Sequence, residues 1–403
     1  MRKRLVNTRA RAGAIGALAA LALGVAACGG DDGGGGGSSS GGADKGPIKL
    51  GYVNALTGAY AVLGGPEFNG VKLAVKDINA EGGVCARKLE VAAQVDDQGQ
   101  PNLSVAGIRK LGAQEDLSVV FGPGLTPNAI AAAPIAESLK KVFIVETAQR
   151  DPWDKRKYVF SVLTPQDVVG ELIVKRMGET LGSGSHKIAI LNAAVPYAQN
   201  GADQLKDLSQ KNGWDVVLTD TYDPTAVSFT SQASKVAKAN PEGLLIWGAG
   251  APGDAQLIKQ VRAAGYKGPA VGDIIWTLPF ISEVAGAAAE TMVGFTQLNN
   301  VDPPANVEKF LTGYKAAYDE EATFLSAASY DGVHVVAEAI KKAGCKADST
   351  SIANAMVDLK YDGVNGPWNY TADYKGGPPS ESFSAATFKD GKPAFAEPVG
   401  EGQ

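Results

Sequence analysis

Short runs of apolar residues alternate with amphipathic segments along most of the chain from Ile48 onward. The first run, IKLGYVNAL, has the composition of a buried strand, and apolar residues recur at helical spacing from Phe68 to Ile78. Later runs of the strand type are KLEVAAQVDD, LSVVFGPG, KVFIVETA, KIAILNAA, WDVVLTD, GLLIWGAG, PAVGDI and TMVGFTQL. This alternation predicts an α/β fold with parallel sheets covered on both faces by helices. We expect the first helix to begin near Pro66 and to end at Gly82 and Gly83.

The segments after the predicted strands are rich in glycine, threonine, asparagine and backbone amides. They read NALTGAY, DDQGQ, GPGLTPN, ETAQ, NAAVPYAQ, GAGAPGD and GDIIW. In open α/β sheets, ligands bind beyond the carboxyl ends of the strands. These segments hold few side chains of the kinds used in catalysis, so they predict a binding cleft rather than an active site.

One strand end resembles a dinucleotide-binding turn. In LLIWGAGAPGDAQL, Gly248, Gly250 and Gly253 form a G-x-G-x-x-G pattern, and Asp273 follows near the spacing of a ribose-binding carboxylate. The pattern is weak in a chain of 50 glycines, and Pro252 lies inside it. The basic and apolar N-terminal segment predicts an exported protein, which would rarely meet a nicotinamide cofactor, so we expect no cofactor here.

The N-terminus predicts export. MRKRLVNTRARAG carries five basic residues, and the apolar run AIGALAALALGVAA follows, as in a secretory signal. Small residues then precede Cys28, as in the lipobox of bacterial lipoproteins. Residues 1–27 are thus predicted to be a signal peptide and Cys28 a lipidated N-terminus on the outer face of the membrane or in the periplasm. The alternative is an ordinary signal with an incidental cysteine.

The residues that follow, GGDDGGGGGSSSGGADKG, have no core-forming side chain, so residues 28–46 are predicted to be a flexible tether. Its coil dimension is roughly 23 Å. Without the signal, 33 basic residues face 43 acidic ones, a net charge of −10 that gives no case for nucleic-acid binding. Of the three cysteines, Cys28 is assigned to lipidation, so Cys85 and Cys345 are left to form one disulfide or to remain two buried free thiols.

The chain is poor in catalytic side chains. Its two histidines, His186 and His334, lie in a turn and in a helical pattern, and no second histidine or cysteine stands at metal-ligand spacing. No G-x-S-x-G motif is present. Acidic pairs such as Asp96–Asp97 and Glu320–Glu321 are typical of solvated surfaces, although they leave a glycosidase pair open. We therefore expect no metal site and no catalytic residues, and we expect that the protein is not an enzyme.

Several long segments resemble one protein family. IKLGYVNALTGAYAVLGGPEFNGVKLAVKDINAEGGVCARKLEV, APIAESLKKVFIVETA, AQLIKQVRAAGYKGPAVGD and SYDGVHVVAEAI resemble type I solute-binding proteins of branched-chain amino acid ABC importers. The resemblance implies two Rossmann-like lobes, each a three-layer α/β/α parallel sheet, joined by three crossovers with a ligand cleft between them. We assign residues 47–163 and 298–370 to one lobe and residues 164–297 and 371–403 to the other.

The resemblance also implies positions for the ligand. Thr126 stands at the hydroxyl that binds the ligand carboxylate, and Ala148 and Gln149 stand at a second carboxylate loop. Tyr197 matches an aromatic residue that covers the ligand on closure. Two of these residues have plainer interpretations, because Thr126 can cap the next helix and Tyr197 can lie on the surface.

Two departures from the family leave the ligand open. Gly250, in the cleft-lining turn of the second lobe, replaces a tyrosine, and the acid that pairs with the ligand ammonium falls on Ile274, beside Asp273. Tyr60 and Trp276 are candidates for replacement apolar surface, although Trp276 is equally suited to hinge packing. The resemblance implies a small amino acid-like ligand, a branched-chain or other aliphatic amino acid, and the two departures leave amides, urea-like compounds and aromatic carboxylates as alternatives.

The expected function is capture of a small solute and its delivery to an ABC permease and ATPase complex. Closure of the two lobes around the ligand would be the signal that the permease reads. A sensor that presents the ligand to a receptor, and an exported hydrolase, are the other classes considered.

Overall fold

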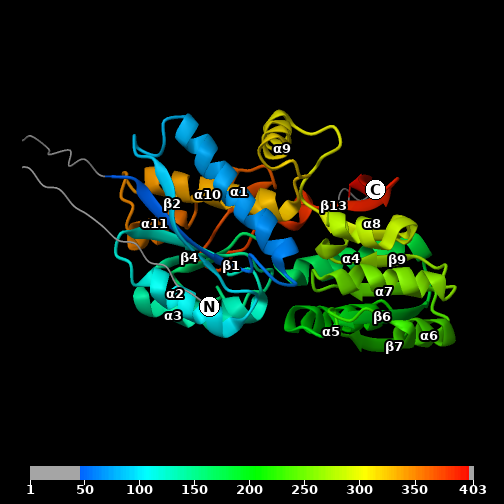
Figure 1. Cartoon of the computed structure of the whole chain (residues 1–403). Coiled ribbons are helices and arrows are strands. Elements are labelled where there is room, and N and C mark those ends of the chain that lie inside the picture. The colour runs from blue at the N-terminus through cyan, green and yellow to red at the C-terminus, as the bar shows by residue number, and fades with distance from the viewer. Residues whose placement is uncertain (1–45, 399–403) are drawn as a thin grey trace, which may run out of the picture. The chain divides into compact units, whose positions relative to one another are not determined.

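A computed structural model describes residues 46–398 of the chain, and Figure 1 shows its helices and strands. Cys28 and the predicted signal lie outside the described residues. The strands are β1 (Ile48–Asn54), β2 (Leu89–Asp96), β3 (Leu117–Phe121), β4 (Val142–Val145), β5 (Val159–Ser161), β6 (Lys187–Ala193), β7 (Asp215–Tyr222), β8 (Gly243–Trp247), β9 (Ala270–Gly272), β10 (Met292–Thr296), β11 (Lys360–Asp362), β12 (Pro367–Asn369), β13 (Ser384–Lys389) and β14 (Lys392–Pro398).

The helices alternate with the strands up to β10 and then form a run of their own. The α-helices are α1 (Ala61–Ala80), α2 (Pro101–Gly112), α3 (Thr126–Leu139), α4 (Gln166–Leu181), α5 (Pro196–Lys211), α6 (Thr230–Ala239), α7 (Pro252–Ala263), α8 (Pro279–Ala285), α9 (Ala305–Tyr318), α10 (Phe324–Lys342) and α11 (Ser349–Met356). Short 3₁₀ turns are η1 (Ile274–Thr277), η2 (Gly286–Thr291) and η3 (Ser380–Ser382).

The strands form two sheets, each the centre of one lobe. Lobe 1 is built on a parallel sheet with the order β2-β1-β3-β4-β5. Lobe 2 is built on the order β14-β13-β10-β9-β8-β6-β7, parallel from β10 to β7, with β13 and β14 added antiparallel at one edge. A separate hairpin pairs β11 with β12. The predicted two-lobe α/β fold is thus confirmed.

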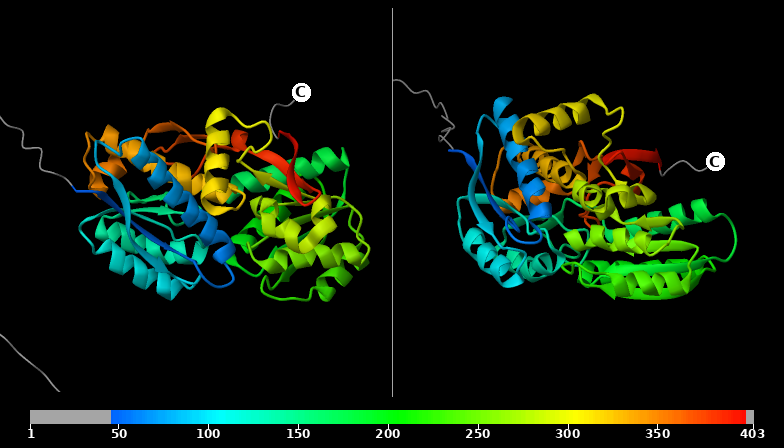
Figure 2. Two further views of the ribbon diagram at one scale, coloured as in Figure 1. Left: turned by 45° about the horizontal axis from the view of Figure 1, so that its top comes forward. Right: turned by 45° about the vertical axis from the view of Figure 1, so that its right-hand side comes forward.

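The chain passes between the lobes three times. It leaves the first sheet after β5, returns after β10 to add α10 and α11 beside α1 and β4, and re-enters the second sheet at β13. Both views in Figure 2 show the orange α10–α11 segment lying with the blue α1 rather than with the green lobe. The close approach of α10 to α1 requires Gly70, since a Cβ there would come within 2.1 Å of the Ser326 carbonyl oxygen.

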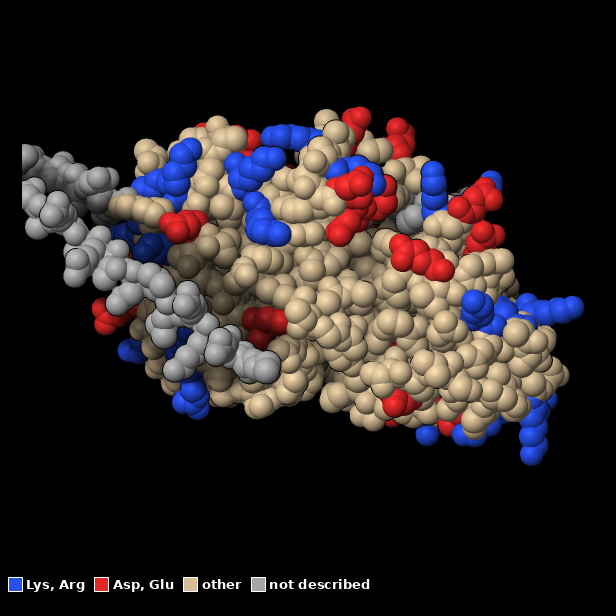
Figure 3. Space-filling model, in the orientation of Figure 1, with Lys and Arg blue, Asp and Glu red and all other residues tan. Residues whose placement is uncertain are grey.

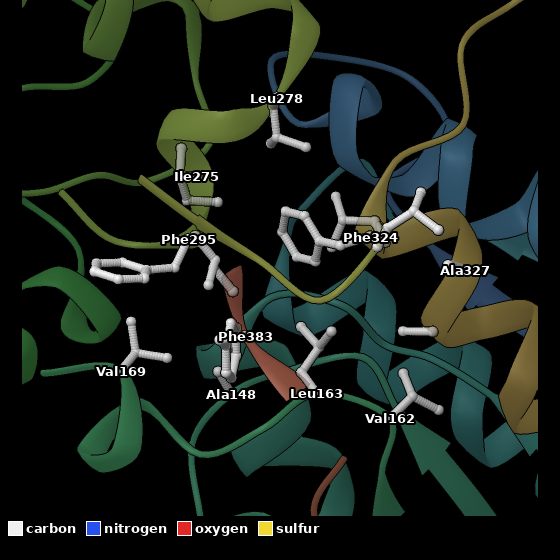
Figure 4. Packing of buried hydrophobic residues seen from close by; sticks show 14 of the residues in the cluster. Ala148, Val162, Leu163, Val169, Ile275, Leu278, Phe295, Phe324, Ala327 and Phe383 are labelled. Atoms are coloured by element: carbon white, nitrogen blue, oxygen red, sulfur yellow. The ribbon is translucent and has the colours of Figure 1, made fainter. Parts of the chain in front are cut away.

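A single apolar cluster runs through both lobes. It includes Tyr52 in the core of lobe 1 and Ile246 in the core of lobe 2, and it continues through the connecting segments. Figure 4 shows Phe324 of α10 between Leu278 of lobe 2 and Leu163 in the first crossover. A second cluster, around Ile108 and Ala132, fills the opposite face of the first sheet beneath α2 and α3. The segments that connect the lobes are therefore packed into the same core as the lobe interiors.

Two details differ from the sequence-based expectation. The first helix begins at Ala61, so Pro66 lies inside it rather than at its start. Strands β5 and β11 to β14 were not predicted, because most are short and none has the long apolar run of a central strand.

Within residues 46–398, no helix combines the length and the apolar character needed to cross a membrane.

Cys85 and Cys345 form a disulfide, the first of the two alternatives that the sequence left open. The bond joins the turn after α1 to the turn after α10, across 260 residues of sequence. It therefore fastens the returning C-terminal segment of lobe 1 to the first helix of that lobe.

Candidate functional site

A cavity of ≈ 160 Å³ lies between the lobes, at the carboxyl ends of the parallel strands. Its volume resembles that of an engineered 150 Å³ protein cavity that binds benzene, so it admits a small organic molecule. Its wall is formed by Asn54, Ala55, Tyr60, Leu63, Glu67, Gly99, Gly124, Leu125, Thr126, Pro127, Glu146, Thr147, Ala148, Leu163, Val195, Pro196, Tyr197, Ala249, Ile274, Ile275 and Leu325. Every strand-end segment named from the sequence contributes to this wall.

On lobe 1, two hydroxyl groups meet at the start of α3. The hydroxyl oxygens of Thr126 and Thr147 lie 2.8 Å apart, and both side chains are buried. Thr126 is the first residue of α3 and Pro127 the second, so the first-turn N–H groups and the helix dipole lie at the cavity. This arrangement favours a carboxylate without a countercharge from a lysine or arginine.

On lobe 2, the start of α5 contributes Val195, Pro196 and Tyr197. The Tyr197 ring packs edge-on against Trp247 with ring centroids 5.7 Å apart. The Tyr197 hydroxyl is buried, and burial together with the nearby Asp273 carboxyl raises the pKa of Tyr197 well above its usual value. Tyr197 therefore presents its ring rather than an ionised oxygen to a ligand.

Two carboxyl groups also line the lobe 1 wall. The side-chain amide of Asn54 donates to Glu67 Oε2 and to Glu146 Oε2, each at 2.6 Å. Glu146 also accepts from Tyr52 at 3.3 Å and, through Oε1, from Ser329 at 2.7 Å. Glu67 and Glu146 retain only 3% and 2% of their exposure, so this acid pair sits in a poorly solvated wall.

Burial governs the ionisation of this acid pair. Desolvation, and next to it the charge of Glu146, raises the pKa of Glu67 well above its usual value. Desolvation also raises the pKa of Glu146 to about 7, against hydrogen bonds that favour its ionised form. None of the wall residues is a lysine, arginine or histidine, so the wall offers these carboxyls no cationic side chain.

The glycine turn after β8 is already occupied by a carboxylate of its own helix. Asp254 Oδ2 accepts from the backbone N–H groups of Ala249, Gly250 and Ala251 at 2.8–3.0 Å. Its Oδ1 accepts from the Tyr222 hydroxyl at 2.6 Å. The amides that would hold a phosphate in a dinucleotide site are therefore saturated within the protein.

Some predicted site residues do not line the cavity. Gly250 is covered by Leu63, since a Cβ at Gly250 would come within 2.7 Å of Leu63 Cδ1, and Ala249 lines the cavity instead. Asp273 is fully buried beneath the turn, where its carboxylate accepts from the Gly248 N–H at 3.3 Å. The next residue, Ile274, lines the cavity instead of Asp273.

Gln149 and Trp276 are also absent from the wall. Gln149 is buried one residue beyond Ala148, which does line the cavity. The Trp276 indole covers Gly272, where a Cβ would fall 2.0 Å from Trp276 Cδ1. Trp276 therefore packs within lobe 2 rather than against the cavity.

Neither histidine lies in the wall. His186 Nδ1 lies 2.9 Å from Glu242 Oε2 near the start of β6, and His334 packs against Tyr330 and Tyr361 in α10. No group of three or more histidine, cysteine or acidic side chains suited to a metal occurs among residues 46–398. The described surface in Figure 3 shows charged side chains mainly near its edges, with uncharged surface between them.

Comparison with known proteins identifies the chain's relatives. A model of the periplasmic binding protein family matches residues 47–392. The chain belongs to this family. It is 27% identical over 342 residues to the leucine-specific-binding protein of Salmonella typhimurium, covering 83% of this chain and 90% of that protein. Membership in this family of binding proteins confirms the expectation that the chain is not an enzyme.

Solved structures of family members share the fold. The branched-chain amino acid transporter substrate-binding protein LivJ of Streptococcus pneumoniae, in complex with isoleucine, matches with a TM-score of 0.77 at 24% identity over 87% of this chain and 100% of that one. A solute-binding protein of an ABC transporter from R. palustris, in complex with benzoate, matches with a TM-score of 0.75 at 20% identity over 88% and 96%. Both likenesses support the fold.

Sequence reasoning missed four polar wall residues: Asn54, Glu67, Glu146 and Thr147. Asn54 and Glu146 do lie in the strand-end segments, but they were not singled out. Glu67 had a detectable signal, because it stands four residues before Val71 on the apolar face of the first helix. A lone acid on such a face is worth noting, since carboxylates are rarely buried without a partner.

Proposed function

We propose that this chain is an extracytoplasmic solute-binding lipoprotein that captures a small amino acid-like ligand and delivers it to an ABC importer. The observation that carries the proposal is the cavity between the lobes, which is lined by strand-end turns of both. A ligand in such a cavity contacts both lobes at once and therefore stabilises the closed arrangement. The name of the leucine-specific relative supports an aliphatic amino acid as the ligand.

The ligand carboxylate would bind at the start of α3. Thr126 and Thr147 supply hydroxyl groups there, and the backbone near Ala148 supplies a further donor. Hydrogen bonds to a charged group contribute about 1.5–3 kcal/mol each, enough to fix the orientation of a small ligand. The aliphatic side chain would then meet an apolar wall formed by Leu63, Leu163, Val195, Ile274, Ile275 and Leu325.

Export and anchoring are part of the same proposal. The basic and apolar N-terminal segments, Cys28 and the tether of residues 28–46 support a binding protein held at the outer face of the membrane. A tether with a reach of roughly 23 Å keeps the binding domain close to a permease in the same membrane.

An aromatic carboxylate is the second candidate ligand. The position where the family's ammonium-binding acid is expected holds Ile274, and this residue lines the cavity. A ligand without an amine would not need an acid on lobe 2. The benzoate complex of the R. palustris protein is a precedent for such a ligand in this fold.

A thermal-shift panel on soluble protein that starts after Cys28 tests the proposal. The panel holds the twenty amino acids, small amides, urea and benzoate, and the protein is first stripped of bound ligand. A ligand at a hundred times its Kd adds about 2.7 kcal/mol of stability. Stabilisation by leucine, isoleucine or valine is expected, while stabilisation by benzoate alone would favour the second candidate.

The variant Thr126→Val then tests the carboxylate position. Loss of one hydrogen bond to a charged group lowers affinity for every carboxylate ligand by roughly 10-fold or more. The matched control is Thr180→Val on the exposed face of α4, where the hydroxyl donates only to the Arg176 carbonyl. Unchanged carboxylate affinity in Thr126→Val would refute the assigned position.

A further inference from the structure

The two lobes contribute unlike chemistry to the cavity. Lobe 1 and the segments packed on it supply the carboxyl groups of Glu67 and Glu146, the amide of Asn54 and the hydroxyls of Thr126 and Thr147. Lobe 2 supplies Val195, Pro196, Tyr197, Ala249, Ile274 and Ile275. The only polar side chain in this second set is Tyr197, whose hydroxyl is buried away from solvent. Recognition of a ligand by polar side chains therefore falls almost wholly to lobe 1.

The acid pair is held in place from several elements. Glu67 comes from α1, Glu146 from the end of β4, and Asn54 at the end of β1 donates one N–H to each. Gly124 closes over this group, because a Cβ there would lie 2.9 Å from Glu67 Oε2 and 2.8 Å from Asn54 Oδ1. Five hydrogen-bonding side chains thus form one fixed group: Tyr52, Asn54, Glu67, Glu146 and Ser329.

The described side chains that contact or act on the acid pair are neutral or acidic. Tyr52 faces it from β1, Asp97 acts on it from the turn after β2, and α10 contributes the hydroxyl of Ser329. Asp97 makes the field more negative, not less. Two neighbouring buried carboxylates repel each other, so the empty site keeps a proton on the pair unless a cation replaces it.

We propose that the group Asn54–Glu67–Glu146 binds the positively charged amine of the ligand, and that amine binding displaces the proton held by the acid pair. The inference rests on the proposed function and names the part of the cavity that reads the amine. A protonated amine is a compact cation with three donors, and the cavity wall supplies it with these two carboxyls. Lobe 1 then binds both the amine and the carboxylate of an amino acid.

This assignment accounts for Ile274. An acid on lobe 2 is not needed if the amine is neutralised on lobe 1, and an apolar residue there packs against the aliphatic part of the ligand instead. It also gives a direction for pH. Amine affinity rises with pH while the acid pair loses its proton, and it levels off once the pair is fully ionised.

Isothermal titration with matched ligands tests the inference. The probes are leucine, isoleucine and valine, each compared with its 2-hydroxy acid, which keeps the carboxylate and side chain but lacks the amine. The unaltered protein is expected to prefer each amino acid over its hydroxy acid. Glu67→Gln and Glu146→Gln are each expected to lower amino acid affinity by roughly 10- to 100-fold and to leave hydroxy acid affinity within a few fold.

Glu242→Gln is the matched control, because it makes the same change at an exposed carboxyl beside His186, outside the cavity. It is expected to change neither affinity. Proton release is measured on the unaltered protein by repeating the titration near pH 6.5 in two buffers of different ionisation enthalpy. This measurement is independent of how well the variants fold.

The outcomes separate the inference from the proposed function. Equal affinity for amino acid and hydroxy acid, or an equal loss of both in the glutamine variants, overturns the amine site while the binding function stands. Absence of proton release overturns the displacement of the shared proton. If the unaltered protein binds none of the titration probes and is stabilised by no member of the thermal-shift panel, the proposed function and the inference are both overturned.

Discussion

The Leu63 side chain of lobe 1 lies directly over the α-carbon of Gly250 in lobe 2. A Cβ built on Gly250 would meet Leu63 Cδ1 at 2.7 Å and Cδ2 at 2.8 Å, and the φ of Gly250 is +79°. Leu63 also lines the cavity. The absence of a side chain at Gly250 therefore does not leave a hole in the cleft, because the opposite lobe fills the space.

Gly250→Ala is expected to disturb both stability and ligand binding. The left-handed backbone costs an alanine about 1–2 kcal/mol, and Leu63 must in addition turn away from the new methyl group. Gly213→Ala is the matched control, since Gly213 has a φ of +74° with nothing within 4 Å of its Cβ position. Urea unfolding and calorimetric titration should show a similar backbone cost in both variants but an affinity change only in Gly250→Ala. In the double variant Leu63→Ala/Gly250→Ala the clash is removed, but affinity should stay low because Leu63 also lines the cavity.

Asp254 is expected to be the main stabilising residue of the glycine turn. Asp254→Ala leaves three buried N–H groups and the Tyr222 hydroxyl without their acceptor, which should lower the free energy of unfolding by about 3–5 kcal/mol. Tyr222→Phe removes only one of these four bonds and should cost about 1.5 kcal/mol. Urea denaturation measures both values. Equal losses in the two variants would contradict the capping role of Asp254.

Reduction of the disulfide is expected to lower stability without weakening ligand binding. Cys345 is exposed and reachable by a reductant, and neither cysteine lines the cavity. A bond that closes a long loop typically contributes about 2–5 kcal/mol. Thermal unfolding with and without dithiothreitol should show this loss. The double variant Cys85→Ser/Cys345→Ser should match the reduced protein and should not respond to the reductant.

His334 is expected to make the protein less stable as the pH falls. Burial lowers the pKa of His334 to about 4, whereas an unfolded histidine takes up its proton near pH 6.5. Between these values the unfolded chain binds more protons than the folded one, so stability falls as pH falls through that window. The full effect is on the order of 3 kcal/mol.

Urea unfolding of the wild type and His334→Phe near pH 7.5 and near pH 4.5 isolates this contribution. The buried acids, whose pKa values are raised, act in the opposite direction, but they are present in both proteins and cancel in the difference. The wild type should lose more stability than the variant on acidification. An identical pH dependence would show that folding leaves the pKa of His334 unchanged.

The fold was largely predictable because each central strand is a continuous apolar run. All nine predicted strands occur, and the strands they form are β1–β4 and β6–β10. The edge strands β13 and β14 were missed because they add to an existing sheet and need no such run. The start of α1 was misplaced, because Gly64, Gly65 and Pro66 resemble a helix boundary in sequence while the structure continues the helix through them.

The wall of the candidate site was predicted to within one residue, and at several positions the predicted residue and the wall residue are neighbours in sequence. Thr126, Ala148, Tyr197 and Tyr60 line the cavity, whereas Gln149 and Asp273 lie one residue away from wall residues. At the end of a strand, neighbouring side chains point in different directions, and sequence alone does not say which one faces the cleft. Asp273 is turned inward by its bond from Gly248, which a one-dimensional pattern does not encode.

The unequal walls of the cavity have a kinetic consequence under the proposed function. A ligand whose charged groups are held by lobe 1 can dock while the lobes are apart, so the encounter rate depends on Asn54, Glu67, Glu146 and Thr126. The apolar wall of lobe 2 adds contacts only after closure and so sets how long the ligand stays. Substitutions at Ile274 or Ile275 should then change the residence time while leaving the rate of capture almost untouched.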